Sequence, residues 1–188
     1  MRYITSMKNK IDHKVTELIS SEEINKIVIN LATVISRDFA NQEVMLVGVL
    51  DGAFAFTTDL SRALHKMGMQ NMIIDFVGID TYGSSTTSSK APRITKDLKH
   101  DIRDKVVLIV EDIVDTGYSL FVLQSLLNAR LPRKLATIAL LSKDTRREID
   151  VPVEYIGKHI PNEFVVGYGL DYEGKYYREL PFIGVVTK

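Results

Sequence analysis

The sequence predicts one α/β domain whose mostly parallel sheet is covered by helices on both faces. Short β-branched runs alternate with longer stretches that carry apolar residues at helical spacing, which is typical of repeated strand-helix-strand units. The chain has 188 residues and 45% hydrophobic content, which suits one well-buried domain and is short for two. We therefore expect a single domain over residues 1–188.

Apolar spacing divides the first three-quarters of the chain into helices and strands. Three amphipathic stretches predict helices, and Ser20 and Ser21 are N-cap candidates for the first. Runs without polar alternation predict strands that are buried on both faces. The expected helices are residues 21–39, 53–67 and 119–129. The expected strands are residues 44–50, 72–79, 93–96, 106–110 and 135–141.

The C-terminal third departs from this rhythm. Short strand signals at residues 154–157, 164–166 and 182–187 are separated by proline and glycine. They predict a small irregular cap on the main sheet, with the N-terminus as a second candidate contributor. Residues 81–92 contain almost no apolar side chain and predict a mobile loop.

Charge and residue usage exclude several classes of protein. Basic and acidic side chains number 24 each, so no net field favours nucleic acid or an anionic membrane. The absence of cysteine removes disulfides and thiolate chemistry and favours the cytoplasm. No apolar run approaches the length of a membrane span, and the four histidines lack metal-ligand spacing.

The most informative motif begins with the strand predicted at residues 106–110. Glu111 and Asp112 follow it directly, at the sheet edge where open α/β sheets bind ligands. Residues 115–119, Asp-Thr-Gly-Tyr-Ser, then form a turn before a helix, where backbone N–H groups and the helix dipole favour a phosphate. The acids can accept hydrogen bonds from ribose hydroxyls or from water around Mg²⁺, so the motif predicts a ribose phosphate ligand. The alternative interpretation is a buried strand followed by a solvated acidic turn.

This pattern at residues 106–119 resembles the phosphoribosyl pyrophosphate motif of the type I phosphoribosyltransferases. Residues 164–172, Phe-Val-Val-Gly-Tyr-Gly-Leu-Asp-Tyr, resemble the base-binding segment of the branch that uses hypoxanthine and guanine. Thr81 and Tyr82 match the pair that begins the long active-site loop of that branch. A closed lid would exclude water from the transferred sugar cation.

The resemblance implies a role for each matching residue. Asp115 would accept the proton of the attacking purine nitrogen or stabilise its developing charge. Its structural alternative is a helix cap. Lys143 would donate to the exocyclic oxygen of the purine, which selects an oxo over an amino group and argues against adenine. The other implied roles are phosphate binding by Asp115, Thr116, Gly117, Tyr118 and Ser119, ribose and Mg²⁺ binding by Glu111 and Asp112, purine binding by Lys143, Phe164, Val165 and Asp171, a further metal contact by Asp171, and pyrophosphate contact by Asp51, Gly52 and Arg178.

One position departs from the family pattern. Leu50-Asp51-Gly52 stands where most relatives have Leu-Lys-Gly, so a lysine charge near pyrophosphate is replaced by a carboxylate. Backbone N–H groups could still make the contact. The resemblance also implies a cis peptide between Leu50 and Asp51.

The resemblance therefore implies an Mg²⁺-dependent enzyme of purine salvage. It would transfer the phosphoribosyl group of phosphoribosyl pyrophosphate to hypoxanthine or guanine, giving IMP or GMP and pyrophosphate. A xanthine-preferring transferase and a non-catalytic nucleotide-sensing regulator of the same fold are the alternatives. The resemblance also implies a homodimer or homotetramer, while the sequence does not choose between these two states.

Overall fold

The computed structural model describes residues 14–80 and 93–187. The loop predicted at residues 81–92, with Thr81 and Tyr82, lies outside the described residues. The described elements are β1 (Lys14–Ile19), α1 (Ser21–Asp38), β2 (Val44–Leu50), α2 (Phe54–Lys66), β3 (Met72–Asp80), β4 (Arg93–Lys96), β5 (Val106–Val114), α3 (Tyr118–Asn128), β6 (Lys134–Ser142), the 3-10 helix η1 (Asp144–Arg146), β7 (Tyr155–His159), β8 (Val165–Val166) and β9 (Ile183–Thr187).

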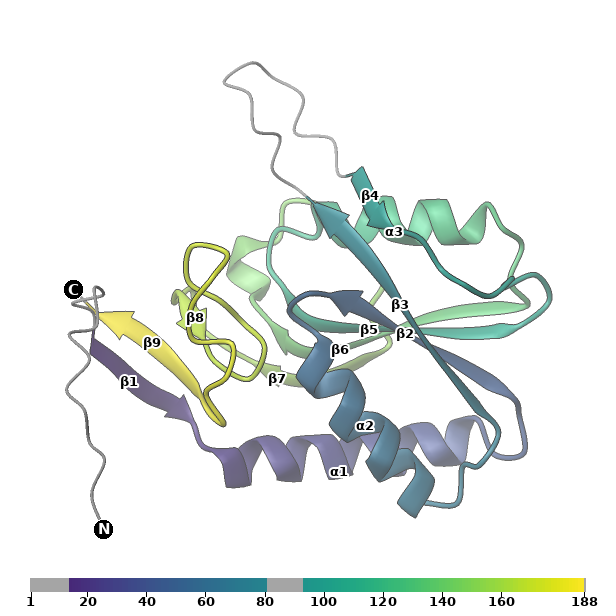
Figure 1. Ribbon diagram of the computed structural model, residues 1–188, viewed down its shortest axis with the longest axis horizontal. Coiled ribbons are helices and arrows are strands. Elements are labelled where there is room, and N and C mark those ends of the chain that lie inside the picture. The colour runs from purple at the N-terminus through teal and green to yellow at the C-terminus, as the bar shows by residue number, and fades with distance from the viewer. Residues whose placement is uncertain (1–13, 81–92, 188) are drawn as a thin grey trace, which may run out of the picture.

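The main sheet is mostly parallel, as the sequence predicts, but it also contains β7, whose residues were expected in the cap and instead pair with β6. In the described part of the chain its six strands lie in the order β4-β3-β2-β5-β6-β7 (Figure 1). Every neighbouring pair is parallel except β3 with β4. The connection from β2 leads through α2 to β3 on one side, whereas β5 leads through α3 to β6 on the other. The order in which successive strands are added to the sheet therefore reverses between β2 and β5, and open α/β sheets bind ligands at such a point.

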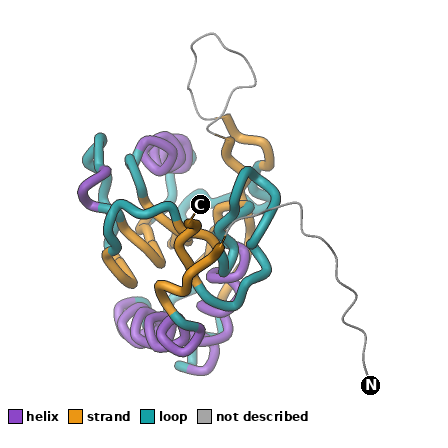
Figure 2. Tube along the Cα trace, turned by 90° about the vertical axis from the view of Figure 1, so that its left-hand side faces the viewer, coloured by secondary structure: helices purple, strands orange, loops and turns teal. Residues whose placement is uncertain are grey.

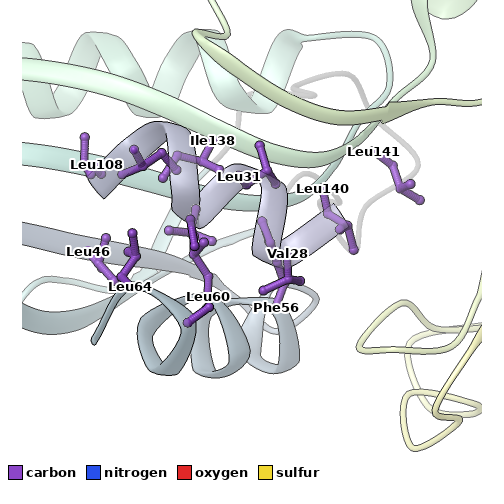
Figure 3. Packing of buried hydrophobic residues seen from close by; sticks show 14 of the residues in the cluster. Val28, Leu31, Leu46, Phe56, Leu60, Leu64, Leu108, Ile138, Leu140 and Leu141 are labelled. Atoms are coloured by element: carbon purple, nitrogen blue, oxygen red, sulfur yellow. The ribbon is translucent and has the colours of Figure 1, made fainter. Parts of the chain in front are cut away.

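Helices cover both faces of this sheet. Figures 1 and 2 show α1 and α2 on one face and α3 on the opposite face. Strand β5 contributes Leu108 to the hydrophobic cluster beneath α1 and α2, and Ile109 to the cluster beneath α3. Figure 3 shows Leu108 of β5, Leu31 of α1 and Leu60 of α2 within the first cluster. Burial of alternate residues on opposite faces explains why β5 lacks polar alternation.

The predicted helix starting near Ser21 is α1, and its N-cap is confirmed. The Oγ of Ser20 accepts a hydrogen bond from the backbone N–H of Glu23 at 3.2 Å.

Among the described residues, no helix is both long and apolar enough to cross a membrane.

Strand β5 is longer than predicted. The sequence suggested that it ends at Val110, but the structure continues it to Val114. The β2 pairing stops where Gly48 faces Val110, whereas the β6 pairing continues until Val114 faces Ser142. Pairing with β6 holds Glu111 and Asp112, the acidic pair of β5, in extended conformation. Their polar side chains gave no sign of a strand, because the hydrogen bonds come from another part of the chain.

Two elements were not predicted. Strand β1 pairs antiparallel with β9, which also pairs with β8, so both ends of the described chain build a second, three-stranded sheet. Four of the six β1 residues are exposed, so its side chains lack a regular apolar pattern. The short helix η1 follows β6 and was missed because three residues carry no periodic signal.

Candidate active site

A cleft of about 930 Å³ lies at the carboxyl ends of β2 and β5. It opens where the two strands part, because β5 continues past Val110 with only β6 as its partner on the sheet. Eight of the residues predicted for the site line this cleft. They are Asp51, Gly52, Glu111, Asp112, Ser119, Phe164, Asp171 and Arg178.

Glu111 and Asp112, the acidic pair of β5, are half-buried at the cleft. Oε2 of Glu111 is buried and has no hydrogen-bond partner within residues 14–80 and 93–187. Burial raises the pKa of Glu111 well above its ordinary value, and the neighbouring charge of Asp112 adds to the effect. Burial also raises the pKa of Asp112 to about 6, although the backbone N–H of Ile113 and the charge of Arg178 oppose this shift. Partly desolvated carboxylates with an unpaired oxygen are suited to receive a cation or hydroxyl donors.

A smaller cavity of about 90 Å³ adjoins the cleft at the start of α3. Asp115, Thr116, Gly117 and Ser119 line it, and Glu111 and Ser119 line both spaces. The first N–H groups of a helix have no intrahelical acceptor and can bind an anion. In α3 the N–H of Tyr118 donates to Oγ1 of Thr116 at 3.4 Å. The cavity thus lies at the turn where the sequence predicts a bound phosphate.

Gly117 shapes this turn. It has φ +88° at the N-cap of α3, a conformation that favours glycine. A Cβ at this position would lie 2.7 Å from the backbone oxygen of Ile149, which is too close for a side chain. The turn thus depends on glycine for both its dihedral angle and its packing.

Asp115 is held by two cationic side chains. The Nζ of Lys143 donates to Oδ2 at 3.2 Å, and the Nε of Arg146 donates to Oδ1 at 3.0 Å. The Lys143 side chain is only 8% exposed, whereas that of Arg146 is 46% exposed. The structure thus brings Lys143 to the site through Asp115, while Arg146 was not predicted.

Asp171 and Arg178 form the C-terminal wall of the cleft. Nη2 of Arg178 lies 2.6 Å from Oδ1 of Asp171, and its Nη1 donates to the backbone oxygen of Gly169 at 2.6 Å. The backbone N–H of Gly174 donates to Oδ2 of Asp171. These contacts fix the guanidinium opposite the acidic pair of β5.

Phe164 supplies aromatic surface to the same cleft. Its ring is 55% exposed and meets the ring of Tyr172 edge to face, with the centroids 5.8 Å apart. Val165, in contrast, is buried in β8 and pairs with Val185 of β9. The side chain of Val165 does not line the described cleft, so any contact with a base would come from its backbone, as the resemblance implies.

The loop after β2 has an unusual backbone and packs closely against the C-terminal segment. The peptide between Leu50 and Asp51 is cis, as the resemblance implied. A Cβ on Gly169, which has φ +103°, would lie 2.0 Å from the backbone oxygen of Gly52. The loop after β2 and the C-terminal segment therefore meet backbone to backbone at Gly52, which lines the cleft.

The described cleft is rich in carboxylates. Besides the predicted acids, Asp80 and Glu173 line it, and Arg178 is the basic residue of its described lining. Although these acids share one cleft, the described residues contain no group of three or more potential ligands close enough together to hold a metal ion by themselves. A cation here would need oxygen ligands from a bound substrate as well, which is how Mg²⁺ is commonly held.

Sequence reasoning did not single out several residues that the structure places at the site. Ile113 lines both the cleft and the small cavity. Tyr172, which belonged to the predicted base-binding segment without a role of its own, lines the cleft next to Phe164. Strand alternation extended past Val110 would have singled out Ile113. Arg146 carries no comparable signal, because it contacts Asp115 from 31 residues away.

Comparison with known proteins places these features in a family. The chain matches the profile of the phosphoribosyl transferase domain over residues 14–173. It is 43% identical over 177 residues to the hypoxanthine phosphoribosyltransferase of Salmonella typhimurium, covering 93% of this chain and 97% of the relative. It is 42% identical over 168 residues to the hypoxanthine-guanine phosphoribosyltransferase of Dictyostelium discoideum, covering 89% and 92% of the two chains.

Solved structures agree. A crystal structure of a hypoxanthine-guanine phosphoribosyltransferase from Bacillus anthracis superposes with a TM-score of 0.84 at 37% identity, covering 94% of this chain and all of the other. A hypoxanthine phosphoribosyl transferase from Trypanosoma cruzi gives a TM-score of 0.85 at 36% identity, covering 95% and 94%.

Proposed function

This chain belongs to the phosphoribosyltransferase family, and we propose that it transfers the phosphoribosyl group of phosphoribosyl pyrophosphate to hypoxanthine or guanine. One observation carries the proposal: Asp115 lines a phosphate-sized cavity and is hydrogen-bonded by the buried Lys143. This arrangement joins a proton acceptor, a phosphate site and a donor for an oxo group. The names of the relatives in Salmonella and Dictyostelium support the same substrates.

The reaction requires a sugar to be held while its leaving group departs. The turn at residues 116–119 would bind the 5′-phosphate through the first N–H groups of α3. Glu111 and Asp112 would accept hydrogen bonds from the ribose hydroxyls at the mouth of the same cavity. Arg178 and the backbone of Gly52 would receive the departing pyrophosphate on the other side of the cleft.

The bond changes then involve the base and Asp115. The bond from the anomeric carbon to the pyrophosphate oxygen breaks, and a bond to a purine imidazole nitrogen forms. The purine becomes more acidic as this bond forms, and the Asp115 carboxylate accepts the proton that it loses. Oδ2 of Asp115 is the oxygen shared with Lys143, so base recognition and proton transfer would take place at neighbouring atoms.

Selection of the base rests on Lys143 and Phe164. An ammonium group donates hydrogen bonds and accepts none, so Lys143 favours a purine with an oxo group at its reach over one with an amino group. The exposed ring of Phe164 offers a face for stacking on a flat heterocycle. Together they support hypoxanthine and guanine and disfavour adenine.

We also propose Mg²⁺ as the cofactor. The donor set fits, because Glu111 has a buried oxygen with no partner in the described residues and Asp112 and Asp171 line the same cleft. When bound, Mg²⁺ would neutralise charge on the pyrophosphate leaving group. The acidic lining at Asp51 increases the need for such a cation, since phosphates and carboxylates repel one another.

The test is nucleotide formation from phosphoribosyl pyrophosphate and Mg²⁺, with hypoxanthine, guanine, xanthine and adenine offered separately. We expect IMP and GMP, little product from adenine, and loss of activity in EDTA that excess Mg²⁺ restores. Preference for xanthine would move the assignment to the xanthine branch. Binding of phosphoribosyl pyrophosphate without product from any base would instead indicate the nucleotide-sensing regulator.

Cytoplasmic location and homo-oligomeric assembly belong to the same proposal. The basis for the first is the chain's lack of cysteine and its relation to enzymes of nucleotide metabolism. Light scattering at several protein concentrations would distinguish a dimer from a tetramer, and a concentration-independent monomer would refute the expected assembly.

A further inference from the structure

Residues 143–149, which follow β6, are hydrogen-bonded on both sides of Asp115 to the turn that is proposed to bind phosphate. The backbone N–H of Lys143 donates to the oxygen of Val114 at 3.0 Å. The N–H groups of Glu148 and Ile149 donate to the oxygen of Thr116 at 3.0 and 3.1 Å. The residues immediately before and after Asp115 are thus fixed by residues 143–149.

Side chains of the same segment hold the carboxylate itself. Lys143 binds Oδ2 of Asp115 and Arg146 binds Oδ1, so each carboxylate oxygen has its own cation. The Arg146 contact uses Nε, the guanidinium nitrogen closest to its backbone. A bond from Nε leaves fewer rotatable bonds between the backbone and the contact than a bond from the Nη atoms would.

Lys143 and Arg146 would have different tasks during the reaction. Lys143 is nearly buried and, in the proposed function, donates to the oxygen of the purine. Its bond to Oδ2 must therefore be shared or exchanged when the base arrives, at the moment when Asp115 accepts a proton. Arg146 bonds Oδ1, the carboxylate oxygen that Lys143 does not contact, so sharing or exchange of the Lys143 bond does not require the Arg146 bond to break.

We propose that Arg146 is a positioning residue, which holds Asp115 in its catalytic orientation while Lys143 turns to the base. This inference rests on the proposed function, because it assigns Asp115 and Lys143 their roles in the transfer reaction. It predicts that Arg146 acts on turnover through Asp115 and leaves the binding of the phosphate unchanged.

Hydrogen bonds within residues 142–147 and to β7 hold the backbone of Arg146 in place. The Oγ of Ser142 donates to Oδ1 of Asp144 at 2.7 Å, and Nη2 of Arg147 donates to the Oγ of Ser142 at 2.9 Å. The Nδ1 of His159, at the end of β7, lies 2.7 Å from Oδ2 of Asp144. These bonds anchor η1, which carries Arg146, to the main sheet. The hydrogen bond to Asp115, and then the charge of Asp115, raise the pKa of Arg146.

Three variants separate the hydrogen bond from the charge. In Arg146→Gln, the amide nitrogen stands as many bonds from the backbone as Nε does, so a neutral donor remains. Arg146→Lys keeps a cationic donor, and Arg146→Leu keeps neither. Arg37→Leu is the matched control, because Arg37 is also an exposed arginine in an ion pair and lies in α1, outside the described lining of the cleft.

We expect Arg146→Leu to lower kcat by at least about 10-fold with the KM for phosphoribosyl pyrophosphate nearly unchanged, since small displacements of reacting groups cost this much or more. Gln and Lys should retain most of the turnover, and Arg37→Leu should match the wild type. In the Asp115→Asn background, Arg146→Leu should cause no further loss, because the two changes act on one group.

Failure of the positioning role can be distinguished from failure of the proposed function. Wild-type turnover from Arg146→Leu, equal losses in the Leu and Gln variants, or additive losses with Asp115→Asn would each overturn the positioning role while leaving the proposed function intact. A raised KM for phosphoribosyl pyrophosphate with unchanged kcat would assign Arg146 to substrate binding instead. Absence of nucleotide formation by the wild-type protein itself would remove the proposed function, and the positioning role with it.

Discussion

Gly52 lies against the carboxylate of Asp112: a Cβ built on Gly52 would stand 1.7 Å from Oδ2 of Asp112. No side chain fits in that space, so the loop after β2 and the acidic pair of β5 are packed as one unit. The glycine is therefore required by its packing against the neighbouring strand β5. Because both residues line the cleft, this contact also sets where the carboxylate stands relative to a substrate.

Gly52→Ala should consequently push Asp112 out of position. We expect kcat/KM for phosphoribosyl pyrophosphate to fall roughly 10²-fold, because a displacement of about 1 Å near the reacting centre has effects of this size. Steady-state kinetics at several Mg²⁺ concentrations would measure it. Gly68→Ala is the control, since a Cβ there would have nothing within 4 Å. Its positive φ would cost stability without affecting turnover. Equal kinetics for Gly52→Ala and wild type would show that the loop adapts.

Asp115→Asn tests the proton acceptor. The amide preserves the shape of the side chain but is a much weaker base, so turnover should fall roughly 10²- to 10⁴-fold. Single-turnover measurements at saturating substrates would establish whether the chemical step is the one affected. Asp150→Asn, at an exposed position, should retain wild-type kinetics. A loss of only a few-fold, with chemistry limiting turnover, would rule out the proposed role of Asp115.

Phe164→Ala tests the stacking surface. Removing the ring should raise the KM for hypoxanthine about 10-fold, because an aromatic contact contributes about 1 kcal/mol beyond buried area. The KM for phosphoribosyl pyrophosphate should change little. Phe121→Ala is the control, since its ring in α3 is similarly exposed at 46% and does not line the cleft. If the two variants behave alike toward the base, stacking on Phe164 is not part of recognition.

The environment of Asp75 makes the stability of the protein depend on pH. The residue is 3% exposed in β3, and its Oδ2 accepts hydrogen bonds from the backbone N–H groups of Lys99 and His100. Burial alone would raise its pKa, but the bond with the His100 ring and the backbone donors outweigh burial and lower the pKa from 3.8 to about 2. The stabilisation is therefore complete above pH 4 and is lost as the pH falls toward 2.

A shift of this size corresponds to about 2 kcal/mol of unfolding free energy. Asp75→Asn should lose a comparable amount at pH 7 and should show a shallower decline in stability between pH 4 and pH 2 than the wild type. Urea titrations at several pH values would measure both quantities, with Asp150→Asn as the control. Parallel pH profiles for wild type and Asp75→Asn would contradict the assignment.

Local sequence was sufficient for most elements of the main sheet. Strand β2 begins and ends where its apolar run does, and Ser20 marks the start of α1, because burial and capping depend on residues near one another in the chain. Strand β1 escaped notice because its pairing with β9 joins the two ends of the described chain. The extension of β5 escaped it because β6 supplies the hydrogen bonds.

The sequence by itself determined the α/β class, because strand and helix signals alternate along the chain. It also determined which acids stand directly before the glycine turn, because the strand, the acids and the turn lie in one continuous stretch from Val106 to Ser119. Only the tertiary structure decided that Arg146 holds Asp115 and that Gly52 touches Asp112. Such contacts join residues that are distant in the chain, and their distances follow from how the strands of the sheet are ordered and where β2 and β5 part. Residue type alone contains no record of that arrangement.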